Sequence, residues 1–273
     1  MSTANAPRPR TSSNLVDSWS FVSSIDETIH SLRNHLAQSV AAHEHIRLDL
    51  LLAGVSESII THSYKGFHNS INNHVDALQN IRDSIRMQYD KLDITDTKVD
   101  MMTLLDSCVM YLYYQATTVQ PGSIHIIESG QESVFVQCDG LRIRRVFQFL
   151  LGMSTISLPA VVNVAELQPQ IIRRRSDADR YVRVHRTREW AECKIVDEGF
   201  VLSTVAINHL RESLEAPLMS AVPHDYTVLT LALCKQIVAV HGGSLRITSF
   251  CTPGGLCITV RLPLAAAPQN QVV

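Results

Sequence analysis

Two long stretches near the start of the chain have an apolar residue at every third or fourth position, the period of an amphipathic helix. In residues 17–53 this stripe consists of Val22, Ile25, Ile29, Leu32, Leu36, Val40, His43, Ile46, Leu50 and Ala53. The second stripe consists of Ile60, Tyr64, Phe67, Ile71, Val75, Leu78, Ile81, Ile85, Tyr89 and Leu92. Between the stripes, Gly54 suits a helix C-cap and Ser56 the next N-cap, although Gly66 is a second candidate for the turn. The pattern predicts two helices of about 35 residues, each ~50 Å long.

Two helices of this length cannot bury their apolar stripes against each other alone. A helical hairpin of this kind usually pairs with a second copy to form a four-helix bundle. We therefore expect a homodimer that forms through the hairpin. Packing of the hairpin on the rest of its own chain is the alternative that the sequence leaves open.

The second half of the chain alternates short strands with helices. Residues around 122–130 and 133–140 look like two strands joined by a short turn, and residues 139–153 predict a helix that Asp139 caps. The apolar face of that helix consists of Leu141, Val146, Phe149, Leu150 and Met153. Two paired strands follow, then a helix over 201–214, a helix that ends at Gly242 and Gly243, and a closing hairpin. The expected fold class is α+β: a helical hairpin followed by an α/β sandwich with a mixed sheet and helices on one face.

Composition excludes several classes of protein. The chain is 45% hydrophobic and 18% charged with a formal net charge of -2, which predicts no general attraction to nucleic acid or to anionic membranes. No apolar run is long enough to span a membrane. The six cysteines are scattered without a C-x-x-C pair, so we expect buried free thiols in a cytoplasmic protein, and no zinc site. The polar residues 1–16 predict a disordered tail.

Seven arginines fall between residues 173 and 188, a density that suits binding of RNA or of an acidic partner. Asp177 and Asp179 dilute this charge, and no ladder of aromatic residues accompanies it. The pattern favours a solvated loop and strand face over a binding site.

Four motifs in order resemble the histidine kinases of two-component signalling. "DGLRIRRVFQFLLG" resembles the family's D-x-x-R-L-R-Q-V-L-x-N-L-L helix, and "VDEGF" resembles its V-x-D-x-G-x-G turn. "LCKQIVAVHGGSLRI" and "GGLCITVRLPL" resemble its last helix and its closing strand. The resemblance spans about residues 20–264. It implies a dimerising hairpin that carries a phospho-accepting histidine, followed by an ATP-binding domain of the GHKL type.

The chain departs from the family at the metal site. In the family, the central helix supplies an asparagine that helps to hold Mg²⁺, an ion that takes oxygen ligands. The corresponding positions here are Phe149 and Met153, and Ile156 stands where the family tends to have a basic residue. We therefore expect no metal ligand at these positions and no ATP or Mg²⁺ cofactor.

The glycine-rich segments depart from the family as well. Asp197 and Gly199 are kept, and in the family that aspartate recognises the adenine amine, so these two residues are candidates for a residual adenine site. Alternatively, Asp197 caps the turn at Gly199. The next glycine of the family is Val201 here, and the glycine turn that approaches the phosphates is the segment Val228–Leu231. Because branched residues disfavour left-handed geometry, we expect this segment to have re-formed without cradling a phosphate.

The segment "HSLRNHL", residues 30–36, resembles the family's H-E-L-R-[TN]-P-L box. The resemblance implies that His30 is the phospho-acceptor, and neutral imidazole is a competent nucleophile near pH 7. Asn34, one helical turn on, is placed to orient a water or an incoming aspartyl phosphate. Ser31 replaces the acidic residue that the kinases use as a base for autophosphorylation. A plain boundary position for His30 is the alternative.

His43 and Glu44 form a second His–acid pair and are the alternative acceptor site. His43 falls on the apolar stripe, and Asp49 stands where the box has a leucine. These features favour a histidine in the bundle interior.

The sequence predicts a tail at 1–16, a hairpin at 17–95, a degenerate histidine-kinase-type ATPase-like domain at 96–265 and a second tail at 266–273. The expected function is that of a phosphorelay protein that transfers phosphoryl groups between receiver domains of response regulators or docks them. The alternatives are an active histidine kinase with a non-standard ATP site and a non-catalytic dimeric scaffold.

Overall fold

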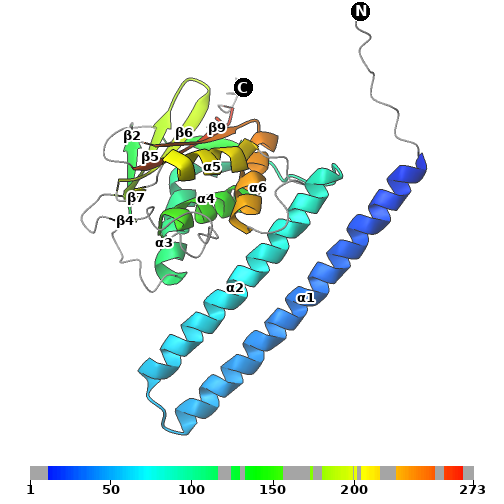
Figure 1. The fold of residues 1–273 in the computed structure, drawn as a ribbon, viewed down its shortest axis with the longest axis vertical. Coiled ribbons are helices and arrows are strands. Elements are labelled where there is room, and N and C mark those ends of the chain that lie inside the picture. Colours follow the sequence, from blue (N-terminus) through cyan, green and yellow to red (C-terminus); the bar gives the residue numbers. More distant parts are fainter. Residues whose placement is uncertain are drawn as a thin grey trace, which may run out of the picture. The chain divides into compact units, whose positions relative to one another are not determined.

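The protein is described here from a computed structural model that covers residues 12–115, 124–129, 133–155, 173–174, 180–198, 200–201, 204–215, 226–249 and 255–266. The chain folds as two compact units, residues 1–93 and 94–273. The first unit is helical and the second combines helices with strands, so the α+β class predicted from the sequence is confirmed (Figure 1). Within the described residues, no helix combines the length and the apolar character that a membrane crossing requires.

The first unit is a hairpin of α1 (Ser12–Leu52) and α2 (Glu57–Gln88). Gly54 has a φ of 78°, and the N–H groups of Gly54 and Val55 bond back to carbonyl groups at the end of α1, so the predicted C-cap is confirmed. Gly66 lies inside α2 and does not form the turn. Ser56 is the N-cap residue of α2, but its side chain makes no capping hydrogen bond and its hydroxyl lies 2.9 Å from that of Ser58.

Three contacts between the helices set the register of the hairpin. The Arg86 guanidinium on α2 bonds both carboxylate oxygens of Asp26 on α1, at 2.6 and 3.3 Å. Phe21 of α1 packs against Tyr89, the residue that follows α2, with ring centroids 5.7 Å apart. Farther along, His43 stacks on Phe67 at 3.9 Å between centroids.

Both helices of the hairpin leave part of their apolar stripes exposed. Val22, Ile29 and Ile60 are buried. In contrast, Leu32 and Ile46 on α1 are 42% and 53% exposed, and Ile81 on α2 is 40% exposed. Within one chain, the two helices therefore bury only part of their apolar surface.

The second unit contains four helices and nine strands among its described residues. The helices are α3 (Met101–Gln115), α4 (Gly140–Thr155), α5 (Thr204–Glu215) and α6 (Tyr226–Val240). The strands are β1 (Thr97–Asp100), β2 (His125–Ser129), β3 (Phe135–Cys138), β4 (Arg173–Arg174), β5 (Arg180–Arg186), β6 (Trp190–Asp197), β7 (Phe200–Val201), β8 (Ser244–Ser249) and β9 (Leu256–Pro263).

The main sheet has five strands in the order β2-β5-β6-β9-β8. β2 is parallel to β5, and the other neighbours are antiparallel, which confirms the predicted mixed sheet. Helices α4, α5 and α6 cover one face of it (Figure 1). The core between sheet and helices includes five side chains with no exposed surface, Leu105, Ile143, Phe147, Leu231 and Ile258.

Two features of this unit differ from the sequence prediction. β2 and β3 do not pair with each other: β2 joins the main sheet beside β5, whereas β3 pairs with β1 in a separate two-stranded sheet. The helix α3 was missed, although Asp100 before it is a typical N-cap residue. Its carboxylate accepts hydrogen bonds from the Met102 N–H at 3.0 Å and the Thr103 hydroxyl at 3.1 Å.

The helix α4 is capped as predicted, and three residues of its predicted apolar face, Val146, Leu150 and Met153, are at most 3% exposed. The carboxylate of Asp139 accepts a hydrogen bond from the Arg142 N–H at 3.1 Å. Leu141, expected on the apolar face, is 68% exposed, whereas Ile143 and Phe147 are fully buried. The reason is that α4 packs on α3 as well as α6, and this pair of neighbours selects the buried face.

The prediction of buried free thiols is confirmed for the described cysteines. Cys108, Cys138, Cys193, Cys234 and Cys257 are buried and unpaired, whereas Cys251 lies outside the described residues. Burial raises the pKa of the Cys108 and Cys138 thiols to about 12.

Candidate functional site

The helix α1 presents His30 and Asn34 together. Both side chains are exposed and lie one turn apart, so they share one side of the helix. The neighbouring Ile29 is 5% exposed and anchors this turn against α2. The ion pair of Asp26 with Arg86 lies one turn earlier on α1. His30 is thus an accessible imidazole on a turn that the hairpin core holds in place.

His43 and Glu44 lie in a different setting, in a cluster of rings and charges between the two helices. The half-buried His43 ring stacks on Phe67 and lies 5.5 Å from the centroid of Tyr64. Glu44 accepts hydrogen bonds from Arg47 at 2.7 and 3.0 Å. The Arg47 guanidinium in turn lies 5.4 Å from the centroid of the Tyr64 ring. Both members of the alternative acceptor pair are therefore engaged in contacts within the hairpin.

The Glu44 carboxylate has an unusually low pKa. Hydrogen bonds from Arg47 and then from Tyr64 lower its pKa from 4.5 to about 2, because they stabilise the charged form. Above about pH 4.5 the carboxylate is charged in both the folded and the unfolded chain, so its full contribution to stability is present. That contribution is lost as the pH falls from about 4.5 to about 2, where the folded protein also takes up the proton.

We expect Glu44→Gln to reduce the free energy of unfolding slightly at pH 7, because the ion pair is partly exposed and water screens it. The difference between wild type and Glu44→Gln should shrink toward zero as the pH falls to about 2. Urea denaturation followed by circular dichroism at several pH values measures it. Asp49→Asn is the matched control, because the exposed Asp49 carboxylate forms no ion pair with any described residue. If the difference in the free energy of unfolding between wild type and Glu44→Gln does not change with pH, the lowered pKa of Glu44 is contradicted.

Asp197, the candidate adenine-binding residue, is buried and faces an arginine. It ends β6 with 1% of its surface exposed. The antiparallel register places it opposite Arg180 of β5, and the guanidinium Nε lies 3.6 Å from the carboxylate. A buried carboxylate needs a cation to offset its desolvation, and Arg180 supplies that charge. Gly199 lies outside the described residues.

Sequence reasoning missed Arg180 as a partner of Asp197. The two strands were predicted to pair, and counting outward from the turn between them would have placed these two residues opposite each other. Antiparallel register makes such pairs predictable once the turn is located. Here the turn is centred on residues 187–190, where Thr187 and Trp190 bond through backbone and side chain.

The two α4 positions that correspond to the family's metal site carry apolar side chains. Phe149 is half-buried, and Met153 is 3% exposed. Neither side chain provides the oxygen ligand that Mg²⁺ prefers. Among the described residues, no group of three or more His, Cys, Asp or Glu side chains is placed to hold a metal ion. These residues do not fit a metal-bound triphosphate, and Ile156 lies outside the described residues.

The segment that replaces the phosphate-binding glycines is helical. Residues 228–231 belong to α6, which begins at Tyr226. Thr230 and Leu231 are 2% and 0% exposed, so this turn of the helix faces the core. Among the described non-glycine residues, only Asp90 has a positive φ. The segment is therefore regular helix, and Val201 is the last residue of β7.

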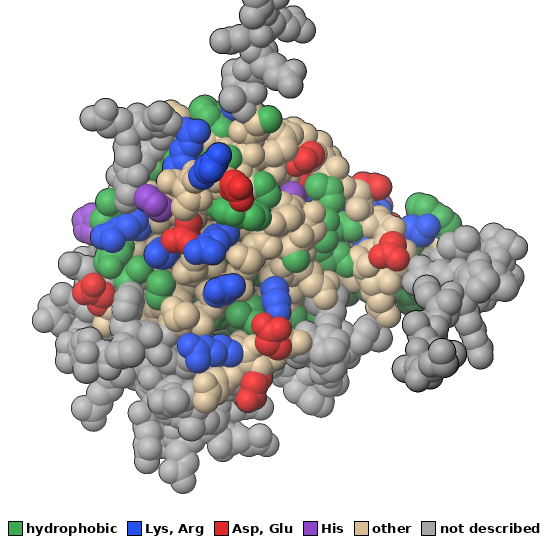
Figure 2. Space-filling view, turned by 90° about the horizontal axis from the view of Figure 1, so that it is seen from above, with side chains coloured by type: hydrophobic (Ala, Val, Ile, Leu, Met, Phe, Trp, Pro, Cys, Tyr) green, Lys and Arg blue, Asp and Glu red, His purple; other side chains and the backbone are tan. Residues whose placement is uncertain are grey.

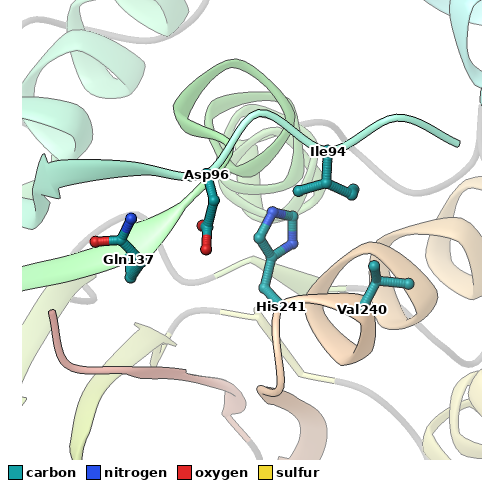
Figure 3. Close-up of a pocket in the computed structure, with 5 residues that line it drawn as sticks. All are labelled: Ile94, Asp96, Gln137, Val240 and His241. Carbon is teal, nitrogen blue, oxygen red and sulfur yellow. The ribbon is translucent and has the colours of Figure 1, made fainter.

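A pocket of about 380 Å³ lies elsewhere in the second unit, lined by Ile94, Asp96, Gln137, Val240 and His241 (Figure 3). His241 is 8% exposed and accepts a hydrogen bond from the Asp139 N–H through Nε2 at 3.0 Å. Its Nδ1 lies 2.7 Å from the Ile237 carbonyl oxygen. A ring with its proton on Nδ1 satisfies both bonds and ties the end of α6 to the start of α4. None of the site residues predicted from the sequence lines this pocket.

Comparison with known proteins reveals a similar fold. No protein-family model and no curated protein sequence matches this chain. The structure of full-length ShkA in complex with AMPPNP matches with a TM-score of 0.54 and 15% identity, over 90% of this chain and 46% of ShkA. Acinetobacter baumannii histidine kinase AdeS matches with a TM-score of 0.48, 14% identity, and coverage of 85% and 98%. A histidine kinase from Burkholderia phymatum matches with a TM-score of 0.43, 16% identity, and coverage of 85% and 99%.

The match to ShkA shows that this chain has the fold of a histidine kinase core, a helical hairpin followed by an α/β sandwich. The resemblance identified from four motifs is confirmed at the level of the fold. This chain spans about half of ShkA, so activity is not transferred with the fold.

Proposed function

We propose that this chain is a phosphorelay protein of two-component signalling, in which His30 accepts a phosphoryl group from one receiver aspartate and passes it to another. The observation that carries the proposal is the placement of His30. On the hairpin of a histidine kinase fold, an exposed imidazole lies beside a buried anchor residue, Ile29, and one turn from the exposed Asn34. A receiver domain that docks along α1 has free access to both side chains.

The transfer step needs no group from the ATPase-like unit. The lone pair of the neutral imidazole attacks the phosphorus of an aspartyl phosphate. The bond between phosphorus and the aspartyl oxygen breaks, the carboxylate leaves with the electron pair, and the imidazole loses its N–H proton to water. The reverse sequence delivers the phosphoryl group to a second aspartate. Asn34 supplies an amide that orients the phosphoryl oxygens.

His30 suits this role better than His43 does. The His43 ring is covered on a face by Phe67 at 3.9 Å, and the carboxylate of Glu44 is bound to Arg47. Phosphorylation of His43 would bring a dianion into a half-buried cluster of aromatic rings, which costs desolvation free energy. At His30 the added charge stays in water.

The second unit supports the proposal through the residues at the positions that correspond to the nucleotide site of histidine kinases. Asp197 is buried against Arg180, Met153 is buried, and residues 228–231 are helical. No step of the proposed mechanism therefore passes through ATP or Mg²⁺. We propose that this unit serves as a docking platform for receiver domains.

The exposed apolar residues of the hairpin support a homodimer. Leu32, Ile46 and Ile81 together with the 63%-exposed Ile59 leave both helices partly unburied in one chain. Contiguous exposed apolar surface on a soluble helix marks an interaction site. A second copy of the hairpin covers this surface as a four-helix bundle.

We expect the double substitution Leu32→Glu and Ile46→Glu to convert the dimer to monomer. Each change places a charge where an apolar side chain would be buried, so association should weaken by about 2 kcal/mol or more, roughly a thirtyfold rise in the dimer Kd. Light scattering coupled to size exclusion over a concentration series measures the Kd. Gln38→Glu with Ala41→Glu adds the same charge at exposed positions off the stripe and should leave the dimer intact. A wild-type chain that is monomeric at all concentrations would refute dimerisation.

Labelling separates the proposal from its alternatives. Phosphohistidine that forms with phosphorylated receiver domains, and not with ATP and Mg²⁺, supports a phosphotransferase. Phosphohistidine that forms with ATP and Mg²⁺ supports an active kinase instead. Receiver domains that bind the chain without transferring label support the non-catalytic scaffold.

A further inference from the structure

The main sheet has one face that the helices leave open. Val182, Val184, Cys193, Ile195, Ile247, Ile258 and Val260 point toward the helices, and each is at most 3% exposed. Since neighbours in a strand point to opposite faces, the residues between them face the other way. Among the residues that the structure describes, the charged side chains on this open face are Arg183 of β5, Glu192 and Lys194 of β6, Arg261 of β9 and Arg246 of β8. We call Arg183, Lys194, Arg246 and Arg261 the basic sheet face.

Three of these four cations lie in one row across the sheet. Arg183 pairs in register with Lys194, Lys194 with Thr259, and Thr259 with Arg246. Three steps between strands of ~4.8 Å each spread the row over ~14 Å. Figure 2 looks onto the molecule from above the strands of Figure 1 and shows Lys and Arg side chains gathered there, with some Asp and Glu side chains between them.

One pairing in this arrangement is unfavourable to the sheet. Like charges directly opposite each other on antiparallel strands repel, as Arg183 and Lys194 do. Glu192 offsets part of the repulsion, because its carboxylate lies 2.9 Å from the Lys194 amine and 2.6 Å from the Arg261 guanidinium. Burial would raise the pKa of Glu192, but the bonds from Lys194 and Arg261 outweigh it and lower the pKa, so this carboxylate stays charged.

The cations of the basic sheet face keep free charge after these pairings. One carboxylate serves two cations, and the Lys194 and Arg261 side chains are each 46% exposed. Arg183 is exposed and lies 5.4 Å from the centroid of the Tyr181 ring, a contact that leaves its charge unneutralised. Arg246 is exposed and has no ion pair among the described residues. Among the described side chains of this face, four cations against one anion leave a net charge of +3.

We infer that the basic sheet face docks a protein partner through a cluster of carboxylates on that partner's surface. The row of cations recognises negative charge on the partner. Because the row spans ~14 Å, the matching acidic cluster should have a similar extent. Arg and Tyr, both present on this face, are enriched in protein interfaces. The inference goes beyond the proposed function, because it requires no chemistry at His30.

Two features of the face favour an acidic protein over a nucleic acid. Glu192 neutralises part of the charge of Lys194 and Arg261, so the cations do not form the continuous strip of positive charge that a nucleic-acid backbone follows. Single-stranded nucleic acids bind open faces by stacking bases on several aromatic rings. Here Tyr181 is half-buried and Arg183 already lies near its ring.

The test measures binding of a fluorescent oligo-glutamate peptide to the full chain by anisotropy. A fluorescent oligothymidylate of equal charge, measured in the same way, represents nucleic acid as the alternative partner. We expect wild type to bind the peptide, more weakly at high salt. The double substitution Arg183→Glu and Arg246→Glu should weaken binding by about tenfold or more. The matched control is Lys65→Glu with Arg144→Glu, which makes the same change in net charge at exposed positions off this face. It should bind the peptide as wild type does.

Three results would overturn the inference. These are an equal loss of peptide binding in the control, tighter binding of the oligothymidylate than of the peptide by wild type, and no peptide binding by wild type. Circular dichroism checks folding of each variant. If Arg183→Glu with Arg246→Glu does not fold, Arg183→Gln with Arg246→Gln removes the same charges without reversal and must still weaken peptide binding. Loss of label transfer at His30 with peptide binding intact would refute only the proposed function.

Discussion

Replacing His30 with glutamine is expected to abolish the transfer of phosphoryl groups from receiver domains to this chain. Glutamine keeps a polar side chain of similar reach but lacks the lone pair of imidazole that attacks phosphorus. Because His30 is exposed, the substitution removes no packing contact and should leave the fold intact. The measurement is the formation of acid-labile radiolabel on the chain after incubation with a panel of receiver domains charged by labelled acetyl phosphate.

Three variants act as controls for His30. His35→Gln and His45→Gln change exposed histidines on the same helix and should transfer label as wild type does. His43→Gln removes the alternative acceptor, and its label should also persist. Label that survives in His30→Gln and disappears in His43→Gln would assign the chemistry to the aromatic cluster instead. Asn34→Ala should slow transfer without abolishing it, because the amide only orients the phosphoryl oxygens.

The substitution Gly243→Ala is expected to destabilise the second unit by about 3 kcal/mol or more. A Cβ atom at this position would lie 2.2 Å from the backbone carbonyl oxygen of Arg261 and 2.9 Å from the side chain of Val238. The carbonyl belongs to β9, whose hydrogen bonds to β6 and β8 hold it in place, so the strand cannot withdraw. Thermal and urea denaturation of the full chain, followed by circular dichroism, measure the loss.

Gly66→Ala is the matched control for Gly243→Ala. Gly66 lies inside α2, and a Cβ atom there would meet nothing within 4 Å. Alanine in an exposed helix interior should stabilise the hairpin by about 0.5–1 kcal/mol. If Gly243→Ala unfolds at the same denaturant concentration as wild type, the close approach of residue 243 to the Arg261 carbonyl of β9 is refuted.

The two glycines at the end of α6 illustrate how far sequence reasoning extends. The Gly-Gly pair predicted the end of the helix, and α6 ends at Val240 as expected. The two residues nevertheless have different roles: Gly242 has a φ of 73°, whereas Gly243 has no room for a side chain. The first role follows from general helix-capping chemistry. The second depends on β9, which contributes a carbonyl from residue 261 and is brought close only by the fold.

The predicted site divides in the same way. The exposure of His30 and the stacking of His43 follow from helical periodicity, because the first lies off the apolar stripe and the second on it. The pairing of Asp197 with Arg180 follows from the register of the β5–β6 hairpin once its turn is located, whereas the burial of Asp197 comes from the fold. The missed helix α3 shows a further limit, since its mostly apolar sequence has no polar face to produce a helical period.

Local patterns along the chain were sufficient for the hairpin, the order of most strands and helices, and the likeness to histidine kinases. They were sufficient because helical period, strand alternation and capping depend on neighbours close in sequence. The tertiary structure decided the pairing of β2 with β5, the burial of Asp197 and the alignment of Arg183, Lys194 and Arg246 across the sheet. The β2–β5 and β6–β9 pairings join strands far apart in the chain, and in such pairings a shift of one residue moves every side chain to the opposite face.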